Sequence, residues 1–306
     1  MAGIKRSKNK SIYRHERWGY IFVMPFFLAF LLFFGIPLAS SVFYSFFEYY
    51  SIGIADVGPN FTRLDNYISL LESDLPKYFI NTLIMWLGGF IPQLFIALVI
   101  ASWFTDARQV IYGRKFFRLV IYMPGVIMAS AWSMIFFTLF SNGGPINSLL
   151  KMLGVIYEPV MFFNSVAGMR ILICILFFIV NIGNTLILLI ATIMGTDVDI
   201  YNSALIDGCS HFQAFFRVVV PTLSPVISYI IITSLIAGIQ MFDMPQILTD
   251  GKGSPDRSTM TLIMYLNRHL LGNNYGMAGA LSVYLFLVSG VLCYVIYRIF
   301  NEKEDR

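Results

Sequence analysis

Six long runs without Asp, Glu, Lys or Arg constrain this chain more than any other feature. They cover residues 18–47, 78–105, 119–140, 171–196, 218–242 and 269–297. Each is long enough to cross a bilayer, which takes about 20 apolar residues in a helix. Backbone N–H and C=O groups in lipid must be paired within the structure, and the alternating pattern of a membrane β-barrel is absent. We therefore expect an all-α membrane protein with six transmembrane helices.

A soluble protein with a large core is the alternative. Its surface would have to be charged, yet only 12% of the 306 residues are charged and the mean hydropathy is +0.73. The basic start KRSKNKSIYRHER could open a signal peptide, but the apolar run after it is about twice the usual 7 to 15 residues. An uncleaved first span is favoured, and an inward membrane flank explains the basic cluster without nucleic acid.

The Lys and Arg residues between the spans predict the orientation. With six spans the two termini share a side, and the segments on that side hold 14 of these residues against 7 on the other. Positive charge marks the cytoplasm, so both termini are expected inside. The domains are then a basic cytoplasmic N-terminus at 1–17, a six-span membrane domain at 18–297 with a cytoplasmic loop at 197–217, and a cytoplasmic tail at 298–306.

Reactive chemistry is missing from the sequence. It contains no His/Glu zinc pattern, no Gly-x-Ser-x-Gly motif and no phosphate-binding Gly-rich loop with Lys and Ser/Thr. Its three cysteines have no metal-ligand spacing. Apart from His269 at a boundary, the spans hold no ionisable group that could bind a coupling ion. We expect no enzyme, no metal and no cofactor bound by this chain, and any energy for transport must come from another subunit.

Neutral polar side chains are the notable content of the spans. They are Asn81, Gln93, Asn181, Asn184, Ser234 and Gln240. Such groups are costly against lipid, so we expect them to face other helices or a wet cavity. Two interpretations stay open: hydrogen-bonded links between helices, or a pathway for a polar, uncharged solute. Phe177 and Phe178 would suit stacking on sugar rings, although aromatic residues in a span also serve packing.

A short polar stretch, NSALIDGCSHFQAFFRVVVPTLSP at 202–225, interrupts the apolar chain on the cytoplasmic side. Apolar positions recur at helical spacing from Tyr201 to Phe216 and predict a short amphipathic helix, followed by a turn or a second short helix along the membrane face. Pro221 and Pro225 fit the start of the fifth span, where a missing N–H costs least. His211, on the polar face, is interpreted as a solvent-exposed or contact residue.

Three outer segments connect the spans on the opposite side, at 48–77, 141–170 and 243–268. The second contains SNGGPINSLL, a turn followed by a short apolar stretch that could lie along the membrane surface. The third contains the turn-rich LTDGKGSPDRST. Plain connection and packing at an outer gate both remain open for these two segments.

The cytoplasmic stretch resembles the EAA loop of binding-protein-dependent ABC transporter permeases. The matching residues are Ala204, Asp207, Gly208, Phe212, Gln213, Phe215, Arg217, Pro221 and Pro225. Asn202 replaces the family's Glu, and Ser203 and Cys209 each replace an Ala. Other segments resemble the carbohydrate-import branch, among them RWGYIFVMPFF, LDNYISLL, GMAGALSVYLF and MFDMPQILTDGKG, the last with Lys252 where Gly is common.

The resemblance implies the type I importer permease fold and a set of partners. These are a second, similar permease in a heterodimer, two cytoplasmic ATPase subunits that use ATP and Mg, and an extracytoplasmic solute-binding protein, in the cytoplasmic membrane of a bacterium. The residues implied in ATPase coupling are Asn202, Ser203, Ala204, Asp207, Gly208, Phe212, Gln213, Phe215 and Arg217. A helix over 202–213 would enter a cleft of the ATPase dimer, with Asp207 bracing it and Gly208 allowing close approach. Asn202 predicts weaker or partner-dependent coupling.

The resemblance also points to a substrate path. Phe177, Val180, Asn181, Asn184, Ser234, Gly238 and Met241 align near positions that contact sugar in maltose-type permeases, and Gln240 joins them as a polar residue of the fifth span. The expected function is import of a sugar or oligosaccharide. The alternatives are a permease for another polar solute, such as a polyol phosphate or a peptide, and a non-transporting scaffold or sensor that recruits an ATPase.

Overall fold

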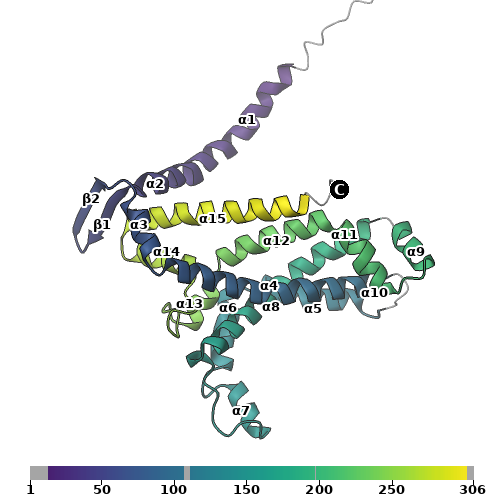
Figure 1. Ribbon diagram of the computed structural model, residues 1–306. Coiled ribbons are helices and arrows are strands. Elements are labelled where there is room, and N and C mark those ends of the chain that lie inside the picture. The colour runs from purple at the N-terminus through teal and green to yellow at the C-terminus, as the bar shows by residue number, and fades with distance from the viewer. Residues whose placement is uncertain (1–12, 107–110, 197, 302–306) are drawn as a thin grey trace, which may run out of the picture. The chain divides into compact units, whose positions relative to one another are not determined.

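The protein is mostly helical in the computed structural model, which describes residues 13–106, 111–196 and 198–301 (Figure 1). Five described helical segments are long and apolar enough to cross a membrane, or six if one bent helix pair counts as a span. The five are Trp18–Tyr44, Leu75–Thr105, Val166–Gly195, Ser224–Leu248 and Tyr275–Phe300. The chain divides into two compact units, residues 1–68 with 269–283 and residues 69–268 with 284–306.

The first unit begins with a span built from α1 (Tyr13–Phe30), the π-helical turn η1 (Leu31–Gly35) and α2 (Ile36–Tyr44). Pro25 lies inside α1 and Pro37 in the first turn of α2. Proline removes a backbone donor, and a widened turn is a usual adjustment around it. The helical span therefore continues through both prolines.

A β-hairpin follows in the first unit. It was not predicted from the sequence. β1 (Phe47–Ile52) pairs antiparallel with β2 (Ala55–Phe61), with a register shift between Glu48 and Tyr50. Asn66, at the start of α3 (Asp65–Glu72), donates hydrogen bonds to the carbonyls of Ser45 and Phe47, both at 2.9 Å. The hairpin is thereby fixed to the end of the first span.

The second unit is organised around α4 (Leu75–Thr105) and α8 (Val166–Gly195), which lie side by side (Figure 1). Glycine permits their close contact, since a Cβ added to Gly89 would lie 2.9 Å from the Cys174 carbonyl oxygen. Deeper along the pair, Gln93 Nε2 donates to Thr185 Oγ1 at 2.7 Å. Pro92 lies inside α4, which continues through it. These two helices match the second and fourth predicted spans.

The third predicted span is not one helix. α5 (Arg114–Val126) and α6 (Ala129–Leu139) are bent by 91° at a short break. Pro124, which has no backbone N–H to donate, lies near the end of α5, and its carbonyl oxygen accepts from Ile127 N at 3.3 Å and from Trp132 Nε1 at 3.0 Å. An apolar run reveals neither the break nor the indole that compensates for it.

The boundaries of the last two predicted spans also differ. The fifth starts later, because η3 (Phe215–Val219) and α11 (Val220–Thr222) precede α12 (Ser224–Ile239), and α13 (Asp243–Leu248) then extends it. Pro221 and Pro225 lie in the first turns of α11 and α12, as expected. The sixth starts at Tyr275 in α15 (Tyr275–Asn301), so His269 belongs to the preceding helix α14 (Leu262–Leu271).

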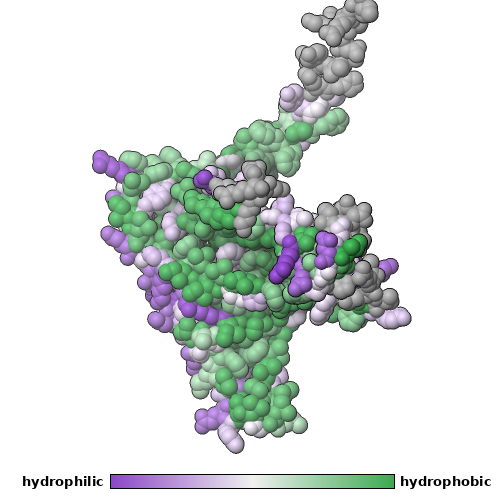
Figure 2. Space-filling view, turned by 45° about the vertical axis from the view of Figure 1, so that its right-hand side comes forward, coloured by the Kyte–Doolittle hydropathy of each residue, from purple (hydrophilic) through white to green (hydrophobic). Residues whose placement is uncertain are grey.

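The surface of these helices is strongly apolar. Figure 2 shows hydrophobic residues over much of the visible face, where a soluble protein would carry charge. Short segments complete the chain: α7 (Pro145–Met152), η2 (Phe162–Asn164), α9 (Val198–Ile206) and α10 (His211–Ala214). Together with the spans, this surface identifies an integral membrane protein that crosses the bilayer several times.

Candidate functional site

The segment predicted for coupling consists of two short helices separated by a sharp turn. α9 ends in two hydrogen bonds, from Cys209 N to Ala204 O and from Gly208 N to Leu205 O, both at 3.1 Å. Gly208 has φ of +90°. This is the Schellman arrangement, in which the residue after the helix takes a left-handed conformation that glycine adopts at least cost. The single helix over 202–213 that the resemblance implied is thus divided at Asp207–Gly208, and the structure agrees with the expectation of a short helix followed by a second one.

The second short helix starts with a reciprocal pair of hydrogen bonds. Ser210 N donates to Gln213 Oε1 at 3.1 Å, and Gln213 N donates to Ser210 Oγ at 3.3 Å. A Ser and a Gln three residues apart that bond each other's backbone form a capping box, which fixes the start of a helix. Gln213, expected as a coupling residue, thus shapes the segment as well as lying on its surface.

The predicted coupling residues fall into two groups. Ser203, Asp207, Gly208, Phe212, Gln213 and Arg217 are exposed, whereas Ala204 and Phe215 are buried. The side chain of Asn202 lies outside the described residues. Ala204 and Phe215 anchor the segment, and the exposed group is the part predicted to contact an ATPase subunit. We call this surface the coupling surface, with Ser203, Asp207, Phe212 and Gln213 as its main members.

Ile206 also belongs to the coupling surface, and the sequence analysis missed it. It ends α9 and is 85% exposed. A fully apolar side chain within a polar stretch between two spans is the signal that could have revealed it. The carboxylate of Asp207, next to it, has no hydrogen-bond or ion-pair partner among the described residues and lies at the helix C-terminus, which already carries partial negative charge.

The predicted path residues are not all in one environment. Phe177, Gly238 and Met241 are buried, Val180, Asn181 and Ser234 are half-buried, and Asn184 and Gln240 are exposed. Asn181 Nδ2 donates to Phe177 O at 2.9 Å, one turn back on α8. For Asn184 and Gln240 no side-chain partner occurs in the part of the chain that the structure describes. The amides of α8 thus differ: one is satisfied within its helix, the other is open.

Ser234 and Gly238 form a small-residue notch, one turn apart on α12, and the indole of Trp86 fills it. Trp86 Nε1 donates to Ser234 Oγ at 3.0 Å, and a Cβ on Gly238 would lie 2.5 Å from Trp86 Cγ. Phe90, one turn further along α4, stacks on Trp86 with ring centroids 5.5 Å apart. Trp86 was not among the predicted residues, because aromatic residues are common in membrane spans.

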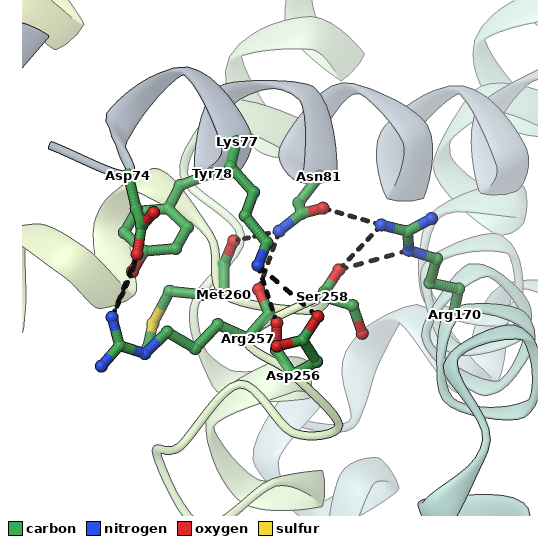
Figure 3. Close-up of polar contacts among 9 residues, drawn as sticks. All are labelled: Asp74, Lys77, Tyr78, Asn81, Arg170, Asp256, Arg257, Ser258 and Met260. Atoms are coloured by element: carbon green, nitrogen blue, oxygen red, sulfur yellow. Dashed lines mark hydrogen bonds and ion pairs between the residues drawn. The ribbon is translucent and has the colours of Figure 1, made fainter. Parts of the chain in front are cut away.

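A polar network fixes the outer loop 249–261 to the first turns of α4 and α8 (Figure 3). Arg170 donates to Asn81 Oδ1 at 2.7 Å and, through Nε and Nη2, to the Ser258 carbonyl oxygen at 3.2 Å. Asn81 Nδ2 donates to the carbonyls of Arg257 and Met260, at 2.9 and 3.4 Å. The loop's backbone acceptors thus receive hydrogen bonds from two different helices.

Charged pairs extend this network at the start of α4. Arg257 Nη1 lies 3.0 Å from Asp74 Oδ2 and 3.3 Å from the Tyr78 hydroxyl oxygen, and these contacts, Tyr78 first, raise the pKa of Arg257. Lys77 Nζ donates to the Asp256 carbonyl oxygen at 3.0 Å. The loop 249–261 thus packs against α4 and α8, while packing at an outer gate stays a prediction. In the described ranges no group of three or more His, Cys, Asp or Glu could hold a metal ion.

Comparison with known proteins decides the family. Residues 91–306 match the family described as binding-protein-dependent transport system inner membrane component. The chain belongs to this family. Curated relatives align with it along nearly their whole length. The lactose transport system permease protein LacF of Rhizobium radiobacter is 27% identical, over 99% of this chain and 100% of the relative. The multiple sugar-binding transport system permease protein MsmF of Streptococcus mutans is 26% identical, over 95% and 97%.

Solved structures share the fold of this inner membrane component. A bacterial ABC transporter involved in the import of the acidic polysaccharide alginate is 21% identical, with a TM-score of 0.75, over 96% of this chain and 98% of the other. The same type of transporter, in complex with a periplasmic protein that holds an alginate pentasaccharide, gives a TM-score of 0.76 over 94% of each chain. The importer permease fold expected from the sequence is thus confirmed.

Proposed function

We propose that this inner membrane component is the permease subunit through which an ATP-driven importer moves a sugar or oligosaccharide into a bacterial cell. The observation that carries the proposal is the full-length similarity to relatives named for the transport of lactose, multiple sugars, and trehalose and maltose. A path lined by amide and hydroxyl groups without charge is consistent with a neutral, hydroxyl-rich solute.

The energy is supplied by two cytoplasmic ATPase subunits that bind ATP and Mg, and this chain is a non-catalytic subunit. Both termini and the coupling surface lie on the cytoplasmic side, as the distribution of Lys and Arg favours. Two features support docking at this surface. Ile206 offers an exposed apolar side chain, and Asp207 places an exposed carboxylate at a helix C-terminus, where a cationic group of a partner would stabilise it.

A second, similar permease completes the pathway. Asn184 and Gln240 are exposed carboxamides within apolar spans, and a polar group facing lipid without a partner is costly. A partner subunit or water along a shared path removes that cost. A solute-binding protein delivers the sugar from outside, and the spans then work by alternating access, so that the path opens to one side at a time.

The test is transport by the whole importer in proteoliposomes, with this chain, its companion permease, the ATPase subunits and the solute-binding protein. We expect ATP-dependent uptake of at least one of labelled lactose, raffinose and maltotriose. Glycerol 3-phosphate and a tripeptide serve as comparison solutes. Uptake of glycerol 3-phosphate or the tripeptide, without uptake of any sugar, would identify a permease for another polar solute. Recruitment of the ATPase subunits without uptake of any solute would indicate a scaffold.

A further inference from the structure

Trp86, on α4, projects its indole onto α12. Its indole is 7% exposed and fills the Ser234–Gly238 notch on α12. The hydrogen bond from Trp86 Nε1 to Ser234 Oγ, 3.0 Å long, is the one side-chain hydrogen bond between α4 and α12 that we find in the described residues. α4 and α8, by contrast, are joined at several levels, including Arg170 to Asn81 and Gln93 to Thr185.

The surfaces that meet at Trp86 have the chemistry of a sugar-ring site. Trp86 and Phe90 provide stacked aromatic faces, with an angle of 14° between the ring planes. Ser234 provides a hydroxyl that both donates and accepts, and Gly238 leaves flat backbone with room for a ring. Binding sites for small polar molecules combine such apolar faces with a few placed polar groups. No charged side chain occurs in α12 or in α4 beyond Lys77, so the site suits a neutral ring.

We propose that Trp86 is a gating and sugar-contacting residue, whose indole occupies the place of a sugar ring in this state. When α4 and α12 separate in the transport cycle, the indole leaves the notch. Its face and the Ser234 hydroxyl then become available to a neutral pyranose ring. This inference rests on the proposed sugar path and adds the residue that closes it.

The mechanism explains why the notch is built from small residues. A larger side chain at Gly238 would exclude the indole, because the added Cβ would already lie 2.8 Å from Trp86 Cβ. A larger apolar residue at Ser234, such as Val or Leu, would remove the hydroxyl that receives the indole N–H. Small residues one turn apart let a neighbouring group approach the helix backbone closely, and here the group is a single side chain that can rotate away.

The first experiment compares sugar uptake by complete importers that carry Trp86→Ala, Trp86→Phe, Ser234→Ala or the control Trp103→Ala. Trp103 lies on the same helix but is 55% exposed. With lactose, raffinose and maltotriose as probes, Trp86→Ala should raise the KM for the transported sugar about fivefold or more, and Trp86→Phe, which keeps an aromatic face, by less. Trp103→Ala should leave the KM unchanged.

The second experiment follows the indole itself. Trp18, Trp103 and Trp132 are replaced by Phe, and the tryptophans of the partner subunits are replaced likewise, so that Trp86 alone reports in the assembled importer. Trapping the complex with Mg²⁺, ATP and vanadate should shift its emission to longer wavelength, because the indole leaves a dry notch, and the transported sugar should then change the intensity. An unchanged emission, or a KM for Trp86→Ala equal to that of Trp103→Ala, overturns the inference.

The two proposals fail in different ways. If the sugar assignment is wrong, the unaltered importer takes up none of the three probes, whereas the nucleotide-dependent emission change still tests whether Trp86 moves. If only the role of Trp86 is wrong, uptake by the unaltered importer is normal. The variants of Trp86 then behave like the Trp103 control.

Discussion

Arg170 Nη2 lies 2.7 Å from Asn81 Oδ1, and this bond joins the outer ends of α8 and α4 beneath the loop 249–261. The same guanidinium holds the Ser258 carbonyl oxygen, so one side chain connects three segments far apart in the sequence. A charged hydrogen bond of this kind contributes more than a neutral one, since half-buried groups lose their water. The pair therefore determines how firmly the outer loop is held.

The first prediction concerns this pair. Asn81→Leu leaves Arg170 without one acceptor and the carbonyls of Arg257 and Met260 without their donor, so the free energy of unfolding should fall by about 2 kcal/mol. Thermal unfolding in detergent measures it. Lys252→Ala is the control, because Lys252 lies in the same loop with a largely exposed ion pair to Asp250 and should change stability by less than about 0.5 kcal/mol. Equal effects of the two variants would contradict the structural role of Asn81.

The second prediction concerns Gly208. Its φ of +90° is unfavourable for residues with a Cβ, so Gly208→Val should distort the turn and cost more than about 1 kcal/mol locally, whereas Gly208→Asn should cost less. We expect sugar-stimulated ATP hydrolysis by the assembled importer to be lost in Gly208→Val and largely kept in Gly208→Asn. Nothing lies within 4 Å of a Cβ at Gly208, so the cause is backbone conformation and not crowding within the chain.

A control for this prediction is available on the neighbouring span. Gly195, at the end of α8, also has open space around it but no left-handed conformation, so Gly195→Val should leave ATP hydrolysis unchanged. Normal stimulation in Gly208→Val would show that the turn does not need its observed shape. Loss in both valine variants would point to the added bulk rather than to the turn.

The third prediction concerns the capping box. Gln213→Ala removes the acceptor for Ser210 N and should destabilise the start of α10 by about 1 kcal/mol, and Gln213→Glu should retain it, because Glu serves the same role. The measured quantity is the affinity of the permease pair for the ATPase subunits. In a double-mutant cycle with Ser210→Ala, the two effects should not add, since both residues act in one pair. Additive losses would exclude the reciprocal pair.

The fourth prediction separates the two amides of α8. Asn184 is exposed and without a partner among the described residues, while the Asn181 amide is engaged with its own helix. If Asn184 lines the path, Asn184→Leu should lower sugar uptake about tenfold without affecting assembly, and Asn181→Leu should have a smaller effect. Ile187→Leu, an exposed apolar position nearby on α8, is the matched control. Uptake unchanged in Asn184→Leu would remove this residue from the path.

Several parts of the fold could be predicted from local sequence alone. The second and fourth spans agree with α4 and α8 to within a few residues, because an uncharged run of that length has few alternatives in lipid. Apolar periodicity from Tyr201 to Phe216 predicted a short helix followed by a turn or a second short helix, and the structure has two short helices there. The hairpin at 47–61 was missed, since its strands are short and its pairing depends on contacts from Asn66 and the end of the first span.

The sequence by itself determined that this chain crosses a membrane, where its apolar runs lie, and which polar stretch between two of them resembles a coupling segment. Each of these follows from local composition, spacing or motif. Only the tertiary structure decided that the third span bends by 91°, that Arg170 meets Asn81, and that Trp86 fills the Ser234–Gly238 notch. Those features join residues many positions apart, and a contact between two helices depends on their register and rotation, which no single run of residues encodes.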